Sequence, residues 1–327
     1  MSKNLITGIG GFVASHLADY LLANGEEVIG TCRKNSDLKK IGHIREKINL
    51  IQMDLLDCEN CLQVFEKTKP DYVHHLAAMA HVPECEKNPR GAFETNAGGT
   101  INILESIRKL REKDEKYNPI IHICSSGEVY GVVKKENLPI NESNTLNPAN
   151  IYGHSKISAE FAAKAYNKKF GLKTIVTRTF SNTGPRRTQL SAEVNFARQI
   201  ALIEKGEQEP VISHGNLDSM RTWMDVRDCA RAYYLVVRRG KPGETYNLAG
   251  NEKRTIEQVL EFLINSSPME DKITKKINLS LVRKDDIPFQ EIDSSKFRNE
   301  TSWVPEIPFE QTMNDLFDWW REEVKIS

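Results

Sequence analysis

The sequence predicts an α/β protein, with a doubly wound parallel sheet followed by a smaller α/β lobe. Short apolar runs alternate with helical patterns through the first half of the chain, which is typical of a parallel sheet with right-handed crossovers. From about Thr188 the rhythm changes to longer helices separated by short strands. The length of 327 residues also favours two units. We expect these units over residues 1–187 and 188–327, with no internal repeat between them.

The first unit reads as strands and helices in alternation. Strand-like runs lie at 3–9, 26–32, 48–54, 72–78, 120–126 and 174–180. Helical patterns fill 13–25, 61–69, 99–113 and 155–171. Gly25 and Gly171 stand where helices should end. Asp57 is expected to cap a helix that contains Cys58 and Cys61, so this CxxC is interpreted as a helix start and no metal site is predicted.

The second unit is predicted to be a smaller lobe that closes over the first. Apolar residues recur at three- and four-residue spacing in four helical segments, 192–206, 226–240, 254–267 and 309–324. Short strand candidates at 210–215, 244–250 and 277–283 separate these helices.

Composition excludes several classes of protein. The 45 Lys and Arg balance 45 Asp and Glu, so no net field attracts nucleic acid or an anionic membrane. Hydrophobic residues make up 39%, which is too many for a disordered chain. No apolar run approaches the ~20 residues of a membrane span. The first residues carry no leader pattern, so a cytoplasmic protein is expected, and six scattered cysteines suggest no disulfide framework.

A glycine-rich turn links the first predicted strand to the first helix. Gly8 permits a tight turn, Gly11 lets the backbone approach a pyrophosphate, and Ala14 keeps the helix close to the sheet. The helix N-terminus, with Phe12 and Val13, then faces the phosphates. In a strand–turn–helix context this spacing predicts a dinucleotide site.

The end of the second strand indicates which dinucleotide binds. A carboxylate at this place usually holds a free ribose 2′-hydroxyl. Here Arg33 and Lys34 follow the strand and no acid stands beside them. The planar guanidinium of Arg33 suits a 2′-phosphate, so NADP is favoured over NAD.

Four further residues form a constellation for proton and hydride chemistry. Ser126 and Glu128 come just after a strand, and Tyr152 and Lys156 lie four residues apart at a helix start, on one helical face. Lys156 is expected to lower the pKa of the phenol, so that Tyr152 takes a proton from a substrate hydroxyl while hydride leaves the same carbon. Ser126 is expected to hydrogen-bond that oxygen.

These motifs together resemble the extended short-chain dehydrogenase/reductases, through GxxGxxA, HLAA at 75–78, SSGEVYG at 125–131 and YxxxK. The likeness runs from about residue 3 to residue 322. The sequence is similar in particular to enzymes that act on GDP-sugars, namely GDP-mannose and GDP-heptose 4,6-dehydratases and GDP-4-keto-6-deoxymannose reductases. The resemblance implies a Rossmann fold, NADP, a nucleotide-sugar substrate and a homodimer or homotetramer.

The resemblance also implies roles for individual residues. Ser126, Glu128, Tyr152 and Lys156 match the catalytic residues of the dehydratases. Cofactor contacts are implied for Gly8, Gly11, Phe12, Val13, Arg33, Asp54, Leu55, Leu76, Ala77, Tyr152 and Lys156. Substrate contacts are implied for Asn182, Arg187, Asn216, Arg221, Arg283 and Asp286. Of these, Arg221 and Arg283 resemble the arginines that grip the diphosphate.

The sequence departs from the family pattern at three places. Gly127 replaces the Asp or Ser that many relatives carry, which removes a proton donor for the leaving hydroxyl. Ser181 stands where the family often has Asn. The loop after the second strand is shorter than in typical mannose dehydratases, whose tetramer contacts lie there.

Glu128 distinguishes the possible functions. A 4,6-dehydratase needs a carboxylate to remove the C5 proton after C4 is oxidised, and it consumes no cofactor. A 4-keto reductase needs only Tyr152, Lys156, Ser126 and external NADPH, although some reductases of this group carry an acid at the position of Glu128. The dehydratase is the first hypothesis, the reductase is the alternative, and a 4-epimerase ranks below both. A binding module without activity is disfavoured because the catalytic Ser, Tyr and Lys are all present.

Overall fold

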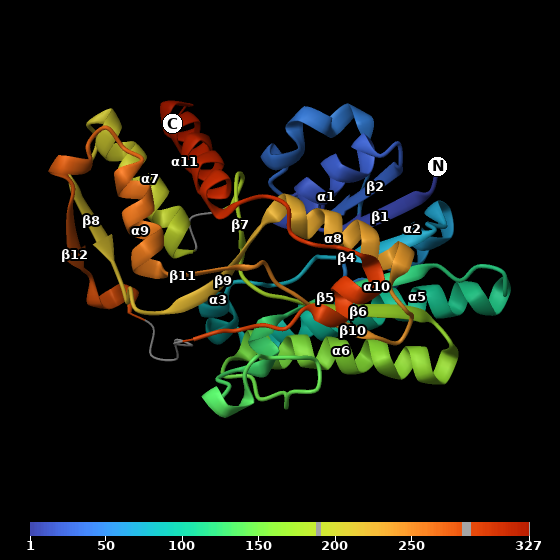
Figure 1. Cartoon of the computed structure of the whole chain (residues 1–327). Coiled ribbons are helices and arrows are strands. Elements are labelled where there is room, and N and C mark those ends of the chain that lie inside the picture. Colours follow the sequence, from blue (N-terminus) through green and yellow to red (C-terminus); the bar gives the residue numbers. More distant parts are fainter. Residues whose placement is uncertain (188–190, 283–288, 327) are drawn as a thin grey trace.

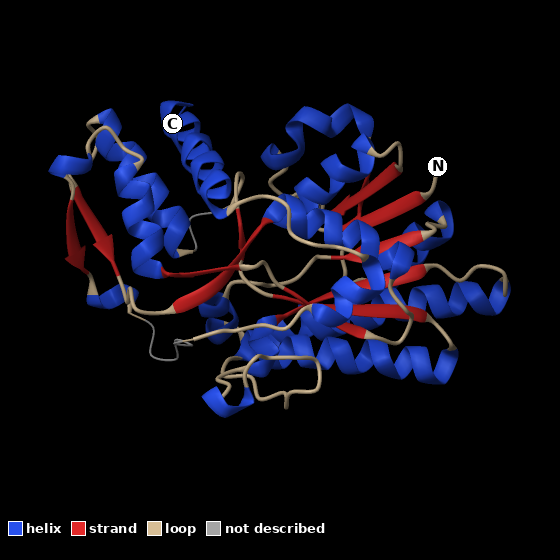
Figure 2. Ribbon diagram, in the orientation of Figure 1, coloured by secondary structure: helices blue, strands red, loops and turns tan. Residues whose placement is uncertain are grey.

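The large sheet of the computed structural model has seven parallel strands in the order β10-β6-β5-β4-β1-β2-β3. The structure describes residues 1–187, 191–282 and 289–326. The sheet strands are β1 (Lys3–Thr7), β2 (Glu27–Cys32), β3 (Asn49–Gln52), β4 (Tyr72–His75), β5 (Ile120–Ser126), β6 (Lys173–Thr179) and β10 (Thr245–Leu248). The sheet confirms the predicted doubly wound α/β fold, because helices cover both of its faces (Figures 1 and 2).

Two helical layers bury the two faces of this sheet. One contains α1 (Phe12–Ala23) and α8 (Val226–Arg239), and the other contains α2 (Cys58–Thr68), α5 (Gly99–Lys113) and α6 (Ile151–Phe170). Strand β1 shows the alternation, since Leu5 packs with Ile103 on one side and Ile6 packs with Val236 on the other. Strands buried on both faces read as continuous apolar runs, which is why the sequence revealed them.

The predicted helix ends are confirmed at Asp57 and Gly171, whereas α1 ends at Ala23 with Asn24 as its C-cap and Gly25 follows this cap. The Asp57 carboxylate accepts from the backbone N–H of Asn60 at the start of α2. Gly171 adopts a left-handed conformation at the end of α6, with φ of +65°. Between β4 and α5 the chain forms α3 (Val82–Lys87), α4 (Pro89–Phe93) and a π-helical turn, Glu94–Gly98.

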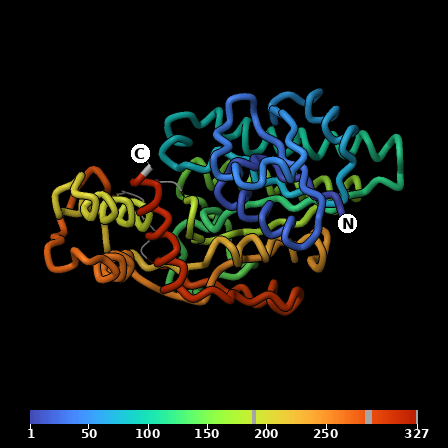
Figure 3. The backbone as a smooth tube through the Cα atoms, turned by 90° about the horizontal axis from the view of Figure 1, so that it is seen from above, coloured from blue at the N-terminus to red at the C-terminus, as the bar shows by residue number. Residues whose placement is uncertain are grey.

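The C-terminal lobe has its own core and two small sheets. Helices α7 (Ala192–Lys205), α9 (Ile256–Asn265) and α11 (Phe309–Ile326) enclose it, and Figure 3 shows these segments gathered at one end. The sheets are β11-β9-β7 and β12-β8, with bounds β7 (Asn182–Thr183), β8 (Val211–His214), β9 (Met220–Asp225), β11 (Glu252–Thr255) and β12 (Thr274–Ile277). The strand expected at 277–283 is wrong in position: β12 ends at Ile277, and Leu279–Leu281 form a 3-10 turn.

Segments beyond residue 187 also complete the large sheet. β10 extends it beside β6, α8 packs against α1, and α10 (Ser295–Thr301) lies beside β10 and α8. The division at residue 187 therefore stays a prediction, and segments on both sides of it contribute to the large sheet and its helices. Within the described residues, no helix is both long and apolar enough to cross a membrane.

Candidate active site

The glycine turn after β1 has the geometry that a dinucleotide pyrophosphate requires. Gly8 has φ of +69°, and a Cβ there would lie 3.0 Å from the Cα and Cβ of Ala77. A Cβ on Gly11 would lie 3.0 Å from the Gly8 carbonyl oxygen. Helix α1 then begins at Phe12 with no side-chain cap and no acidic residue in its first turn. Its positive end and backbone N–H groups at Phe12 and Val13 therefore fit an anionic phosphate.

Hydrogen bonds hold the loop after β4 against this turn. The Thr7 hydroxyl accepts from the backbone N–H groups of Leu76 (3.1 Å) and Ala77 (3.0 Å) and donates to Nδ1 of His75 (2.9 Å). His75 Nε2–H then donates to Thr100 (3.0 Å). Burial lowers the pKa of His75 to about 3, so the ring is neutral and this tautomer is fixed. The two predicted cofactor residues, Leu76 and Ala77, are thereby placed opposite Gly8.

The predicted adenosine-binding residues emerge from two neighbouring strand ends. Cys32 of β2 lies in register with Gln52 of β3, and Arg33 and Asp54 follow these strand ends. Arg33 is exposed, and within the described residues its side chain has no hydrogen-bond or ion-pair partner. Leu55 is buried, and a Cβ on Gly99 of α5 would lie 3.0 Å from it.

The four predicted catalytic residues gather where β5 meets α6. Ser126 ends β5, and its hydroxyl accepts from the backbone N–H of Glu128 (3.2 Å) in the 3-10 turn Gly127–Tyr130. Tyr152 is the second residue of α6, and Lys156 lies buried four residues further on. Ser126 also hydrogen-bonds Tyr152. The strand end and the helix start thus bring these side chains to one edge of the sheet.

The protonation of this group differs from the expectation that Lys156 lowers the pKa of the phenol. Burial raises the pKa of Tyr152, and the hydrogen bond with Ser126 acts in the opposite direction. Burial also lowers the pKa of Lys156. The same desolvation therefore acts against the charged forms of both side chains.

The structure describes four of the six predicted substrate residues. Asn182 on β7 and Arg221 on β9 lie on neighbouring strands, where Asn182 is paired with Met224. Arg187 stacks over the Phe12 ring at 5.3 Å but already pairs with the buried Glu193 at 3.0 Å. Asn216 is exposed, and its amide donates to the Ser219 hydroxyl (3.2 Å). Arg283 and Asp286 lie outside the described residues.

Two asparagines that the sequence analysis missed connect the parts of this site. Asn96, in the π-helical turn, donates to Ser155 of α6 (2.8 Å) and accepts from the backbone N–H of Met79 (2.8 Å). Asn150 caps α6 and contacts Glu128. Asn150, two residues before Tyr152, was a readable capping signal, whereas nothing in the local sequence marks the π turn.

The departure at Gly127 has a steric cause. A Cβ on Gly127 would lie 2.4 Å from two ring carbons of Phe180. Phe180 is itself buried and stacks on Tyr130, with ring centroids 6.0 Å apart. An acidic side chain at position 127 is therefore incompatible with Phe180 in this place.

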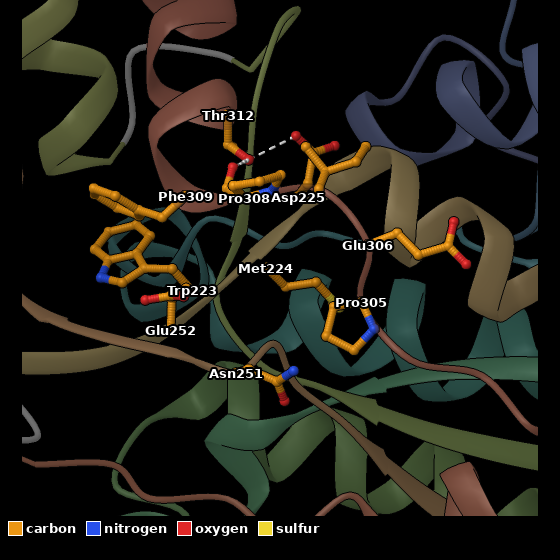
Figure 4. Close-up of a pocket in the computed structure, with 11 residues that line it drawn as sticks. Trp223, Met224, Asp225, Asn251, Glu252, Pro305, Glu306, Pro308, Phe309 and Thr312 are labelled. Carbon is orange, nitrogen blue, oxygen red and sulfur yellow. Dashed lines mark hydrogen bonds between the residues drawn. The ribbon is translucent and has the colours of Figure 1, made fainter.

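One pocket lies away from these residues. It has a volume of about 170 Å³ and lies between β9, β11 and the segment 305–309 (Figure 4). Asp225 in its wall accepts from the Thr312 hydroxyl (2.8 Å) and pairs with Arg227 (2.7 Å). Its lining contains none of the predicted catalytic residues, so its polar contacts are read as structural.

Comparisons with known proteins identify the family of this chain. The family model of GDP-mannose 4,6 dehydratase matches residues 5–316. The chain is 30% identical to the dTDP-glucose 4,6-dehydratase of Salmonella typhimurium, over 97% of this chain and 92% of that enzyme. It is 28% identical to the GDP-6-deoxy-D-mannose reductase of Pseudomonas aeruginosa, over 98% and 97% of the two chains.

Solved structures are similar over the whole chain. The structure of RMD from Pseudomonas aeruginosa complexed with NADPH has a TM-score of 0.82 and 26% identity, covering 99% of this chain and 100% of that one. The UDP-glucose 4-epimerase of Thermotoga maritima with UDP-glucose has a TM-score of 0.85 and 25% identity, covering 98% and 99%. The chain thus belongs to the extended short-chain dehydrogenase/reductase family, as an enzyme of its nucleotide-sugar 4,6-dehydratase group.

Proposed function

We propose that this enzyme is a nucleotide-sugar 4,6-dehydratase that converts a GDP-sugar, GDP-mannose or GDP-heptose, to its 4-keto-6-deoxy derivative. The observation that carries the proposal is Glu128, a carboxylate held beside Ser126 and Tyr152 at the end of β5. A reductase has no step that needs this carboxylate, whereas a dehydratase needs it to remove the C5 proton.

The residues divide the reaction between them. When bound, NADP supplies a place where the C4 hydride is kept until it returns to C6. Tyr152 accepts the proton of the 4-hydroxyl, with Ser126 hydrogen-bonded to the same oxygen, and Lys156 stabilises the phenolate. Glu128 removes the C5 proton that the new ketone acidifies and passes this proton to the C6 hydroxyl, which leaves as water. C5 then takes up a proton from solvent while Tyr152 releases the proton of the 4-hydroxyl, so the substrate loses one water and no cofactor is consumed.

The choice of GDP is supported by the family model and opposed by the relatives named dTDP-glucose 4,6-dehydratases. Incubation with GDP-mannose, a GDP-heptose and dTDP-glucose tests it. We expect a product lighter by one water from a GDP-sugar, formed without added NADPH. Dehydration of dTDP-glucose alone would overturn the GDP assignment and leave the dehydratase reaction standing.

Glu128→Gln tests the reaction itself. The amide keeps the shape of the side chain but does not accept the C5 proton, so turnover should fall by about 10²–10⁴. Oxidation at C4 needs only Ser126, Tyr152, Lys156 and the cofactor, so reduced nicotinamide should accumulate in the variant. Exchange of C5 hydrogen with solvent deuterium should disappear together with turnover.

The second candidate is an NADPH-dependent 4-keto reductase, which two observations favour. Phe180 leaves no room for an acid at Gly127, and a relative is named GDP-6-deoxy-D-mannose reductase. Wild-type enzyme that consumes NADPH with a 4-keto sugar, at a rate that Glu128→Gln barely alters, would replace the dehydratase with this reductase.

We further propose that NADP, rather than NAD, is the cofactor, since Arg33 is exposed and unpaired within the described residues. Arg33→Ala should weaken NADP(H) binding by about one to two decades, because a charge-assisted phosphate contact contributes roughly 1.5–3 kcal/mol. Titration by fluorescence of both reduced cofactors measures this. Equal losses for NADPH and NADH would show that Arg33 does not read the 2′-phosphate.

A further inference from the structure

The side-chain amide of Asn150 bonds in two directions. Its Oδ1 accepts from the backbone N–H of Gly153 (2.8 Å), and its Nδ2 donates to Oε2 of Glu128 (2.9 Å). These partners fix the orientation of the amide, because a backbone N–H needs an acceptor and a carboxylate needs a donor.

The Oδ1 half determines where α6 begins. Asn150 has extended backbone angles (φ −142°, ψ 163°), and the helix starts at the next residue. Tyr152 is therefore in the first turn and Lys156 in the second. A change in this cap would move the start of the helix that carries both groups.

The Nδ2 half holds the carboxylate. Glu128 is half-buried, and within the described residues Asn150 is the one hydrogen-bond partner of its side chain. Its other oxygen, Oε1, is thus left to accept a proton. A positioned general base needs one oxygen that fixes the carboxylate and a second oxygen that accepts the proton, and Glu128 has both.

Close backbone packing makes the contact possible. A Cβ on Gly153 would lie 2.8 Å from the Glu128 carbonyl oxygen, and a Cβ on Gly131 would lie 2.0 Å from that of Asn147. The segment before α6 therefore lies directly on the turn that carries Glu128. Asn147 N–H also donates to the Val129 carbonyl (3.1 Å).

We propose that Asn150 is a positioning residue that locks the base Glu128 to the helix bearing Tyr152 and Lys156. The inference rests on the proposed dehydratase function, in which one group acts at C5 and the others at C4 of the same ring. The Asn150 amide therefore sets the distance between Glu128, which acts at C5, and the helix whose side chains act at C4. Serine or aspartate would cap α6 as well as asparagine does, but neither offers Glu128 an N–H donor.

The test separates the two halves of the amide. Asn150→Ser keeps the cap and replaces the amide N–H donor with a shorter hydroxyl, and Asn150→Asp keeps the cap and sets a second carboxylate against Glu128. Thr255→Ala is the control: Thr255 caps α9 in the C-terminal lobe, so this change removes a helix cap outside the turn that carries Glu128 and outside α6. Each variant is assayed with a GDP-sugar for kcat, KM, the rate of nicotinamide reduction, C5 deuterium incorporation and thermal midpoint.

For Asn150→Ser we expect kcat and C5 deuterium incorporation to fall together by roughly 10- to 100-fold, the effect of misplacing a catalytic group by about 1 Å. KM, the rate of nicotinamide reduction and the thermal midpoint should stay near wild type. Asn150→Asp should lose at least as much. Thr255→Ala should lower the thermal midpoint and leave all rates unchanged.

Three outcomes would overturn the inference. Wild-type C5 incorporation in Asn150→Ser would show that Glu128 needs no anchor. An equal fall in nicotinamide reduction and C5 incorporation would show that Asn150 is merely structural. Absence of C5 incorporation in the wild-type enzyme would overturn the proposed function, and this positioning role with it, so the two failures are told apart by the wild type.

Discussion

At the scale of single residues, Gly127 limits what the catalytic turn contains. Many relatives place a proton donor between the serine and the glutamate, but here the Phe180 ring occupies that space. Phe180 in turn stacks on Tyr130, whose hydroxyl donates to Asn247 (2.7 Å). The absence of the acid is therefore built into the packing beneath the turn, and in the proposed mechanism Glu128 is the carboxylate that this turn supplies.

Gly127→Ala tests this packing. The new methyl would collide with a buried aromatic ring, so we expect the free energy of unfolding to fall by about 1–3 kcal/mol, as in overpacked cores. Gly42→Ala is the matched control, because no atom lies within 4 Å of a Cβ built there and the change should be neutral or slightly stabilising. Urea denaturation measures both. Equal midpoints for the two variants would mean that Phe180 moves aside at no cost.

At the scale of elements, the sequence predicted what local patterns encode. The parallel strands and their helices were found because apolar runs, caps and glycines mark them. β12 was misplaced because its residues, 274–277, are exposed and partly charged, whereas the more apolar stretch after it forms a turn. The pairing of β10 with β6 joins segments over 60 residues apart and leaves no local trace. The π turn that places Asn96 had no signal either.

Three buried histidines on the neighbouring strands β4 and β5 make the free energy of unfolding depend on pH. His74 and His122 lie in register with ring centroids 5.7 Å apart, and His75 follows on the other face. Burial lowers the pKa of His74 and His75 to about 3, and that of His122 well below its usual value. These rings stay neutral in the folded protein but take up protons in the unfolded chain below about pH 6.5. Acid therefore favours the unfolded state.

We accordingly expect the free energy of unfolding to fall as the pH drops from 6.5 to 5, by up to about 1.4 kcal/mol per pH unit for each such histidine. His74→Leu should make this slope shallower by one histidine's share. His74 suits the test because, within the described residues, neither of its ring nitrogens has a hydrogen-bond partner to lose. Urea titrations at several pH values measure the slope, and identical slopes for variant and wild type would contradict the assignment.

At the scale of the whole molecule, the small sheet joins the two lobes at the substrate side. Strand β7 follows β6 of the large sheet directly and pairs with β9, which carries Arg221. Helix α8, which follows β9 directly, packs back against α1. The predicted substrate residues on β7 and β9 are therefore tied to the same helix layer that supports the glycine turn, so the lobes are placed by shared elements rather than by a linker.

We expect a partner subunit on the opposite helix layer, α5 and α6, because these helices match the ones that pair subunits in the superfamily that the sequence resembles. The apolar residues of α5 also favour a covered face, but Ile103, Leu104, Ile107 and Leu110 are buried within the chain itself. What remains outside is Ile101 on α5, 39% exposed, and Phe161 on α6, 59% exposed. The two helices lie side by side, joined by a bond from the Tyr166 hydroxyl to Glu105 (2.5 Å), so both side chains belong to one helical layer (Figure 1).

A dimer through this layer predicts a scattering mass of twice the 37.2 kDa chain at micromolar concentration. Phe161→Glu should return the mass to that of one chain, because it sets a charge into an apolar contact while altering a side chain that the monomer leaves exposed. Val304→Glu, at a position 49% exposed on another part of the surface, should keep the wild-type mass. Circular dichroism checks that both variants stay folded. If the wild-type protein has the mass of one chain, the dimer prediction is wrong. If Phe161→Glu still has the mass of two chains, the interface does not include this part of α6.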